Sequence, residues 1–402
     1  MRSFVTAVVL GLLACTPALS EQIVLNGQPE ADDGVWQANI GAVFNSDILA
    51  NYGAASEKPD ESTPKPLPSR LLYQWPEGWW IENIAVRPNG NLLISTSTLS
   101  ATVWEVKEPW KENPETVLVY NFDEWADRLI GIGQTTPDTF VVVGSRFYNP
   151  GPFSSHVDRT FCAMELDFSK NKEKPEARLI AWFPDAILLQ AVAALPWKPT
   201  TVLISDQYVL RGRYEQVDWK PSRGQIWRLD TLTGEKEVVM GNYTAMDTTY
   251  LRGPGVGING IKIRGNTLFW VNQDTGGVYS FEIDENGYPV PRDAEPKVLA
   301  DVPTSWNDFD IGPGDIDTIW STSFFHTVMA ISPNNGTAIP IGGRGTTDPE
   351  VYPGPTSAAF GKTKHDSHIL YVTGNMEKTY DHFSGIALKG WVRAVDTTGF
   401  HF

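Results

Sequence analysis

From Ser69 to the end of the chain, short runs of apolar residues alternate with tight polar turns, and the helical spacing of apolar residues is nearly absent. One unit recurs along this stretch: an apolar strand, a tight turn, a second apolar strand, a loop and a third strand. Its first hairpin occurs six times, as ENIAVRPNGNLLIST, LIGIGQTTPDTFVVVGS, LQAVAALPWKPTTVLISD, INGIKIRGNTLFWVNQ, NDFDIGPGDIDTIWSTS and PTSAAFGKTKHDSHILYVTG. A repeat of about 55 residues is near the length of a propeller blade.

The two ends of this repeated region complete each other. The sixth unit lacks an outer strand, because the chain stops soon after GWVRAVDTTGFHF. A lone strand, SRLLYQW (Ser69 to Trp75), precedes the first unit and can supply the missing one. Pairing of the two removes an exposed sheet edge. The pattern therefore predicts an all-β protein with a single six-bladed β-propeller over residues 69–402, closed by an N-terminal strand.

The first 68 residues have a different character. Residues 1–20, MRSFVTAVVLGLLACTPALS, combine a basic start, a short apolar run and a small-x-small end, which is typical of a cleaved secretory signal peptide. The segment LLAC also resembles a bacterial lipobox on Cys15, so a lipoprotein is a minor alternative. Residues 21–68 are poorly patterned and proline-rich near their end, and we expect an N-terminal extension or linker. These features predict the secretory pathway or the extracellular space.

Composition narrows the range of partners. The formal net charge of −16 makes nucleic acid and anionic membrane poor partners. Cys162 alone remains after removal of the signal, so we expect no internal disulfide. Glycosylation sequons begin at Asn242 and Asn335 and fit a eukaryotic secretory route. The partners that we expect are apolar small-molecule substrates, and a homodimer is compatible with the sequence.

In a propeller, the starts of the innermost strands and the loops after the second strands meet at one mouth of the central channel. The predicted starts are Glu82, Leu129, Gln190, Asn259, Asn307 and Thr356, four of which have carboxylate or carboxamide side chains with acceptor oxygens. The long loops at this mouth cover residues 145–160, 206–223, 323–326 and 375–383. Candidate substrate contacts near the mouth are Trp80, Tyr208, Trp306, Phe324 and His326. Such loops can roof an apolar pocket that contains a few polar groups.

The Glu82 start, the Asn259-Gly260 start and the motif NDF resemble the axial motifs of the senescence-marker-protein/gluconolactonase (regucalcin-like) propellers. In that family a Glu, two Asn and an Asp hold one divalent cation, and the Asp assists hydrolysis. By position, the resemblance implies Glu82, Asn259 and Asn307 as ligands if a metal such as Ca²⁺ binds, with Gln190 at the place of the other Asn.

The sequence departs from that family at two of these places. Gln190 is longer than Asn and is followed by Ala191, and Asn307 cannot act as a general base. Asp308, one residue on, is expected to point to the opposite side of its strand. Hard cations favour carboxylates. We therefore expect no cofactor, and Glu82, Asn259 and Asn307 stay as metal ligands only for the case that a metal binds.

The chain also resembles a fungal secreted branch of these propellers that serves natural-product gene clusters. That branch includes the trichothecene-cluster propeller protein and the hetero-Diels–Alderases of tropolone–sesquiterpene pathways. The resemblance rests on ENIAVRPNGN with its Arg after the first strand, on NDFDI, and on the signal peptide and sequons. It implies a metal-independent pericyclase that joins an apolar terpenoid and polyketide pair.

A pericyclic reaction suits these residues, because it needs positioning and hydrogen-bond donors rather than a nucleophile. Amide donors would be Gln190, Asn259 and Asn307, and the carboxylate of Glu82 would orient them. No Gly-x-Ser-x-Gly motif, phosphate loop or dinucleotide fingerprint occurs. Two alternatives stay open: a divalent-metal lactonase or related hydrolase of the gluconolactonase type and, more weakly, a non-catalytic binder of an apolar metabolite.

Overall fold

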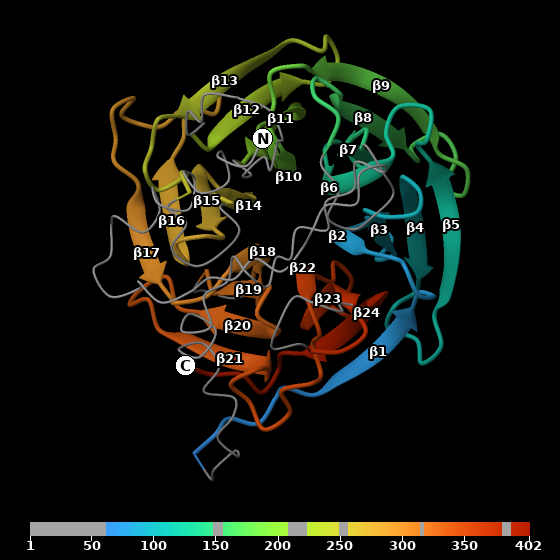
Figure 1. Cartoon of the computed structure of the whole chain (residues 1–402), viewed down its shortest axis with the longest axis vertical. Coiled ribbons are helices and arrows are strands. Elements are labelled where there is room, and N and C mark those ends of the chain that lie inside the picture. Colours follow the sequence, from blue (N-terminus) through green and yellow to red (C-terminus); the bar gives the residue numbers. More distant parts are fainter. Residues whose placement is uncertain (1–61, 148–155, 208–222, 249–255, 314–316, 380–386) are drawn as a thin grey trace, which may run out of the picture. The chain divides into compact units, whose positions relative to one another are not determined.

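Six four-stranded antiparallel sheets surround a central axis in the computed structural model (Figure 1). The structure describes residues 62–147, 156–207, 223–248, 256–313, 317–379 and 387–402, and every regular element there is a strand. We call the sheets blades 1 to 6 in chain order, and each blade runs from an innermost to an outermost strand. This arrangement confirms the predicted six-bladed β-propeller.

Blades 1 to 5 are each built from four consecutive strands. Blade 1 contains β2 (Ile81–Val86), β3 (Leu92–Thr96), β4 (Thr102–Lys107) and β5 (Glu115–Asn121). Blade 2 contains β6 (Arg128–Gln134), β7 (Thr139–Ser145), β8 (Phe161–Asp167) and β9 (Glu176–Phe183). Blade 3 contains β10 (Leu189–Leu195), β11 (Lys198–Asp206), β12 (Gln225–Asp230) and β13 (Lys236–Gly241). Blade 4 contains β14 (Ile258–Arg264), β15 (Thr267–Asn272), β16 (Gly277–Glu282) and β17 (Lys297–Asp301). Blade 5 contains β18 (Trp306–Ile311), β19 (Ile319–Ser323), β20 (Thr327–Ile331) and β21 (Ala338–Gly343).

Blade 6 closes the ring by joining the two ends of the repeated region. It contains β22 (Pro355–Phe360), β23 (Ile369–Met376) and β24 (Leu388–Asp396), and its outermost strand is β1 (Ser69–Gln74). The register pairs Ser69 with Val395 and Gln74 with Trp391, and Figure 1 shows the first strand beside the last. The N-terminal strand therefore closes the propeller, as the sequence predicts.

Apolar side chains between neighbouring blades form the core. The strands β2, β3 and β7 are buried along their whole length, and the apolar runs IAV, LLI and FVVV lie within them. The largest fully buried side chains are Trp75, Trp270, Trp306 and Trp391. Cys162 is a free cysteine and is also buried in this core. This rigid core fixes the positions of the innermost strands.

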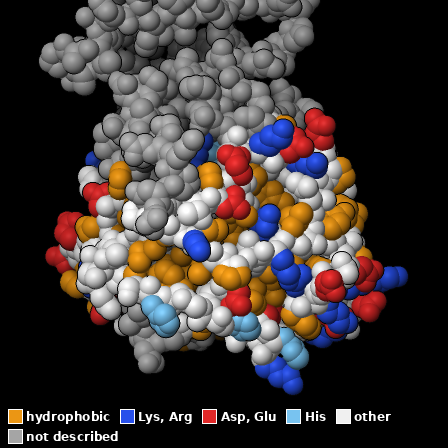
Figure 2. All heavy atoms as spheres, turned by 90° about the horizontal axis from the view of Figure 1, so that it is seen from below, with side chains coloured by type: hydrophobic (Ala, Val, Ile, Leu, Met, Phe, Trp, Pro, Cys, Tyr) orange, Lys and Arg blue, Asp and Glu red, His pale blue; other side chains and the backbone are white. Residues whose placement is uncertain are grey.

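The surface of the described part carries charges of both signs. Figure 2 shows acidic, basic and apolar side chains interspersed on one face, with no extended basic patch among the residues described there. The sequon residues Asn242 and Asn335 are both exposed. Within the described residues, no helix has the length and apolar character needed to cross a membrane.

Candidate active site

Every innermost strand carries one extra residue at the same level of the channel. In blade 3, for example, Leu189 pairs with Asp206 and Val192 with Ile204, so that two residues oppose Ser205. The same shift occurs in β2, β6, β14, β18 and β22. The irregular positions are Glu82, Ile130-Gly131, Gln190-Ala191, Asn259-Gly260, Asn307-Asp308 and Thr356. We call this set the axial ring.

Five of the six predicted strand starts lie in the axial ring, and one prediction was wrong by one residue. Leu129 pairs regularly with Gly144 and is buried in the core between blades 1 and 2, so Ile130 takes the axial place. A bulge re-aims the side chains around it. Asp308 consequently does not obey the simple alternation that would turn it away from the channel network, and this expectation also needs correction.

Hydroxyl groups on second strands connect the ring across blades 1, 3 and 5. Ser95 Oγ accepts from the Asn83 amide at 3.1 Å and donates to the Ile130 carbonyl of blade 2 at 2.9 Å. Ser205 likewise accepts from Ala191 and donates to the Asn259 carbonyl of blade 4 at 2.7 Å. These bonds satisfy backbone groups that the bulges release from the ladders.

Thr322 repeats the pattern in blade 5. It accepts from the Asp308 amide at 3.2 Å and donates to the Thr356 carbonyl of blade 6 at 3.1 Å. Sequence reasoning missed these three hydroxyls. The available signal is a Ser or Thr one residue before the end of the second strand, in LLIST, VLISD and IWSTS.

Glu82 lies in the ring with only 8% of its surface exposed. Trp80 Nε1 donates to its Oε2, and the Gln190 side chain also hydrogen-bonds to it. Burial raises the pKa of Glu82 from 4.5 to about 7; the two hydrogen bonds oppose the shift, and the charge of Asp308 adds to it. Near neutral pH, Glu82 therefore exists in both protonated and ionised forms.

Asn259 connects blades 4 and 5 within the ring. Its Nδ2 donates to Asn307 Oδ1 at 3.1 Å and to Gln273 Oε1 at 2.8 Å, and all three residues are buried. The structure thus brings together two predicted site residues, and it adds Gln273, which sequence reasoning missed. Gln273 directly follows the second strand of its blade, in WVNQ, and a polar side chain at this position is the available signal.

Asp308 forms a separate group of polar contacts at the axial ring. Its side chain is 2% exposed and accepts from Asn83 Nδ2 at 3.2 Å, Ser357 Oγ at 2.7 Å and Lys262 Nζ at 2.9 Å. These donors come from blades 1, 6 and 4. The ammonium group of Lys262 therefore neutralises this carboxylate from within the protein.

The axial residues do not fit the divalent cation of the gluconolactonase-like propellers. Asn259 and Asn307 bind each other, Glu82 is held by Trp80 and Gln190, and Asp308 is paired with Lys262. A hard cation needs several oxygen ligands, carboxylates among them. Among the described residues, no group of three or more His, Cys, Asp or Glu side chains is placed to hold a metal ion.

The residues predicted to contact the substrate lie in different environments. Trp80 and Phe324 are half-buried. Trp306 is fully buried in the core of blades 4 and 5 and donates to the Gly276 carbonyl at 2.8 Å, which corrects its assignment to the mouth. His326 is buried, and its Nδ1 accepts from the Gly354 amide at 2.9 Å, so this nitrogen is used within the protein. Tyr208 lies outside the described residues.

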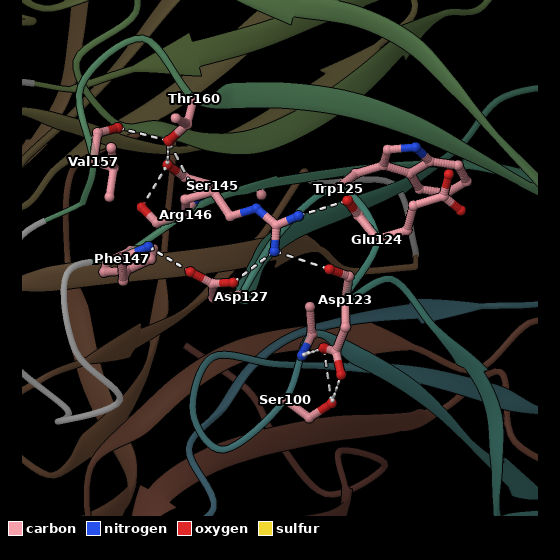
Figure 3. Close-up of polar contacts among 12 residues, drawn as sticks. Ser100, Asp123, Glu124, Trp125, Asp127, Ser145, Arg146, Phe147, Val157 and Thr160 are labelled. Carbon is pink, nitrogen blue, oxygen red and sulfur yellow. Dashed lines mark hydrogen bonds and ion pairs between the residues drawn. The ribbon is translucent and has the colours of Figure 1, made fainter.

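Hydrogen bonds and an ion pair hold the stem of the first long loop in place (Figure 3). Arg146 Nη1 donates to Asp127 Oδ1 at 2.7 Å, and the other oxygen of Asp127 accepts from the Phe147 amide at 2.9 Å. The hydroxyls of Ser145 and Thr160 are 2.9 Å apart and connect the two sides of the stem. Residues 148–155 of this loop, 208–222 of the second and 380–386 of the fourth lie outside the described residues.

The raised pKa of Glu82 makes stability depend on pH. Because the folded state binds this proton more tightly than the unfolded state, the contribution of Glu82 is fully present below about pH 4.5 and is lost as pH rises to about 7. We expect the unfolding free energy of the wild type to fall relative to that of Glu82→Gln by about 1 kcal/mol per pH unit in this window. Urea unfolding of both proteins at pH 5, 6, 7 and 8 measures this difference, and parallel curves would show that Glu82 titrates normally.

Comparison with solved structures finds the same fold in two enzymes. A luciferin-regenerating enzyme matches with a TM-score of 0.56 at 14% identity, over 83% of this chain and 96% of the other. A gluconolactonase from Xanthomonas campestris matches with a TM-score of 0.50 at 12% identity, with the same coverage. At such identities the likeness shows the fold alone: a six-bladed propeller with the gluconolactonase-like architecture. No protein-family model matches the chain.

Two curated proteins are much more similar. "Putative hetero-Diels-Alderase asR5" from Sarocladium schorii is 52% identical over the full length of both chains. A "Putative hetero-Diels-Alderase" from Phoma sp is 57% identical over 81% of this chain and 92% of its own length. The chain belongs to this family of hetero-Diels-Alderase propellers.

Proposed function

We propose that the protein is a pericyclase of fungal secondary metabolism that catalyses a hetero-Diels–Alder cycloaddition between two apolar partners. The observation that supports this class most directly is the identity of 52% over the full length with a relative named for that activity. The buried ring of amides around Glu82 supports the mechanism. We further propose that the partners are a terpenoid and a polyketide.

The reaction makes modest chemical demands on the protein. A four-atom diene that contains oxygen and a two-atom alkene form one C–O and one C–C bond, while π bonds are consumed and no atom leaves. The protein must hold both partners in a reactive pose and exclude water. A hydrogen bond to the oxygen of the diene withdraws electron density and lowers the barrier.

The axial ring can supply such hydrogen bonds. Asn307 accepts from Asn259 through Oδ1, so the chemistry that it offers a ligand is donation through Nδ2. Gln190 is oriented by Glu82, and the protonated form of Glu82 is itself a donor. We propose that Gln190 and Asn307 activate the diene and that Glu82 orients Gln190. Both N–H groups of Asn259 are taken by Asn307 and Gln273, so the proposed role of Asn259 is to orient Asn307.

A direct assay tests this function. The purified protein is incubated with an oxygen-containing heterodiene and an apolar alkene, and product formation is followed by chiral chromatography. We expect a rate above the uncatalysed background and a strong excess of one stereoisomer. A background rate with the background product ratio, together with hydrolysis of lactones, would favour the hydrolase instead.

The environment of the axial residues also predicts how activity responds to metal removal. Since Lys262 already neutralises Asp308, and Asn307 stands where the hydrolytic family has an Asp, we expect turnover to be unchanged by EDTA. Elemental analysis should find less than about 0.1 equivalent of calcium, zinc or manganese. Stoichiometric metal together with loss of activity on chelation would overturn this proposal and support a metal-dependent lactonase.

We also propose that the protein enters the secretory pathway and is glycosylated. The apolar N-terminal segment supports the first part, and exposure of Asn242 and Asn335 supports the second. Asn335 Oδ1 accepts from the Thr337 amide at 3.0 Å, within its own sequon on an outer turn of blade 5. Such a turn is accessible to a glycosylating enzyme.

A further inference from the structure

Three carboxamide side chains occupy equivalent places just above the axial ring. The backbone amides of Gln207, Gln273 and Asn375 donate to the carbonyls of Leu188, Gly257 and Gly354, at 3.1, 3.0 and 3.0 Å. Each acceptor lies two residues before the axial residue of its blade. We call Gln207, Gln273 and Asn375 the upper amides; they belong to blades 3, 4 and 6.

The contacts of Gln273 show which residues a side chain at this position can touch. Gln273 Oε1 accepts from Asn259 Nδ2 at 2.8 Å, so a side chain here contacts the axial residue of its own blade. Asn375 holds the equivalent position in blade 6, as the bond of its backbone amide to Gly354 shows. Blade 6 lies next to blade 1, to which Glu82 belongs (Figure 1). Asn375 therefore lies at the level of the proposed site.

The carboxamide of Asn375 is fully buried, and neither Nδ2 nor Oδ1 finds a hydrogen-bond partner among the described residues. Gln207, which is 2% exposed, has an unpartnered Oε1 as well. Native proteins hydrogen-bond the great majority of their buried polar atoms. A side chain that leaves both of its polar atoms unpaired is therefore an exception that requires an explanation.

The groups around Asn375 are already engaged with each other. The Gly354 amide donates to His326 Nδ1, and the Gly354 carbonyl accepts from the Asn375 backbone. The hydroxyls of Thr356 and Thr373 are paired at 3.0 Å. The donors among these groups are therefore already engaged with other acceptors.

We propose that Asn375 is a specificity-determining residue whose carboxamide binds a substrate group that accepts one hydrogen bond and donates another. The Oε1 of Gln207 would accept a further hydrogen bond from the same ligands. This inference rests on the proposed function, since it places the polar end of a substrate in the mouth of the channel. It adds to the axial donors a residue that selects which substrate is bound.

The first test measures stability without any substrate. If the amide is unsatisfied in the free protein, Asn375→Leu removes buried unpaired polar atoms at nearly constant size. We expect its melting temperature to rise by about 2 °C. Asn375→Val serves as a smaller apolar variant in case leucine overpacks the site, and at least one of the two should be no less stable than the wild type.

A matched control variant should change the melting temperature in the opposite direction. Asn272, fully buried at the end of β15, donates to the Ala245 and Asp247 carbonyls and accepts from the Asp274 amide. Asn272→Leu should therefore lower the melting temperature. If Asn375→Leu and Asn375→Val are destabilised to the same degree as Asn272→Leu, the Asn375 amide is satisfied in the free protein and the inference falls.

The second test measures recognition with a simple probe. δ-Valerolactam presents a carbonyl acceptor and an N–H donor side by side, whereas N-methyl-δ-valerolactam lacks the donor. Titration followed by NMR should show that the wild type binds the lactam about tenfold more tightly than its N-methyl derivative, and that Asn375→Leu abolishes this preference. Equal binding of both lactams by the wild type, or an unchanged preference in the variant, would overturn the inference. Because neither test measures turnover, failure here is distinguishable from failure of the proposed cycloaddition.

Discussion

Replacement of Arg87 by alanine should lower the free energy of unfolding by about 3–5 kcal/mol. Arg87 directly follows β2, and only 1% of its surface is exposed. Its guanidinium group forms ion pairs with Glu105 of blade 1 and with Asp138 of blade 2, the latter at 2.8 Å. It also stacks over the Phe168 ring at 3.7 Å. Removal of the cation leaves two buried carboxylates with too few partners, and Lys172, which contacts Asp138, compensates for one of them only in part.

Urea unfolding of Arg87→Ala and of a control, Arg178→Ala, measures this effect. Arg178 pairs with Glu165 at 2.7 Å, but its side chain is 45% exposed, and such pairs contribute little. We expect the control to lose less than about 1 kcal/mol. Equal losses in the two variants would show that the buried pair has no special role in joining blades 1 and 2.

The architecture could be predicted because each of its parts leaves a local pattern. The Asn89-Gly90 turn flanked by apolar runs specifies a hairpin, and Gly90 indeed has a φ of 89°. Six such hairpins and one unpaired strand before the first of them leave few arrangements other than a closed ring. The Arg that follows the first strand, Arg87, is one of the residues on which the family resemblance rests. In the structure it is buried and forms ion pairs with residues of two blades.

The details of the site depend on features that a strand pattern does not encode. A regular strand alternates its side chains, so the sequence places Asp308 opposite Asn307. The extra residue in β18 breaks that rule, and Asp308 joins Lys262, Asn83 and Ser357 instead. Each of these contacts crosses between blades that are distant in the chain, and no local spacing predicts them.

The strand pattern also does not predict where two of the tryptophans lie. Trp80 and Trp306 were both expected near the mouth. Trp80 precedes β2 by one residue and donates to Glu82, whereas Trp306 is the first residue of β18 and belongs to a core cluster with Phe269 and Phe309. A difference of one position relative to the start of the strand separates the two environments, and the sequence pattern does not fix that start to one residue.

Loss of an axial amide should reduce the rate of cycloaddition by about 100-fold, if the donors act on the oxygen of the diene as donors act in an oxyanion hole. We predict this for Asn259→Ala, which leaves the proposed donor Asn307 without the partner that orients it. Gln190→Ala should show a similar loss, because it removes the amide that Glu82 orients. Both changes should lower stereoselectivity, since the uncatalysed background then contributes more product.

Single-turnover rates and product ratios of the two variants, compared with the uncatalysed reaction, test this expectation. Melting temperatures should stay within a few degrees of the wild type, because neither Asn259 nor Gln190 belongs to the apolar clusters of the core. Asn335→Gln, an exposed change on blade 5, provides a control that should match the wild type in rate and in product ratio. If Asn259→Ala and Gln190→Ala both retain full rate and stereoselectivity, the axial ring is a structural network in which Glu82 holds the channel together. Activation of the diene must then come from the loops around the mouth.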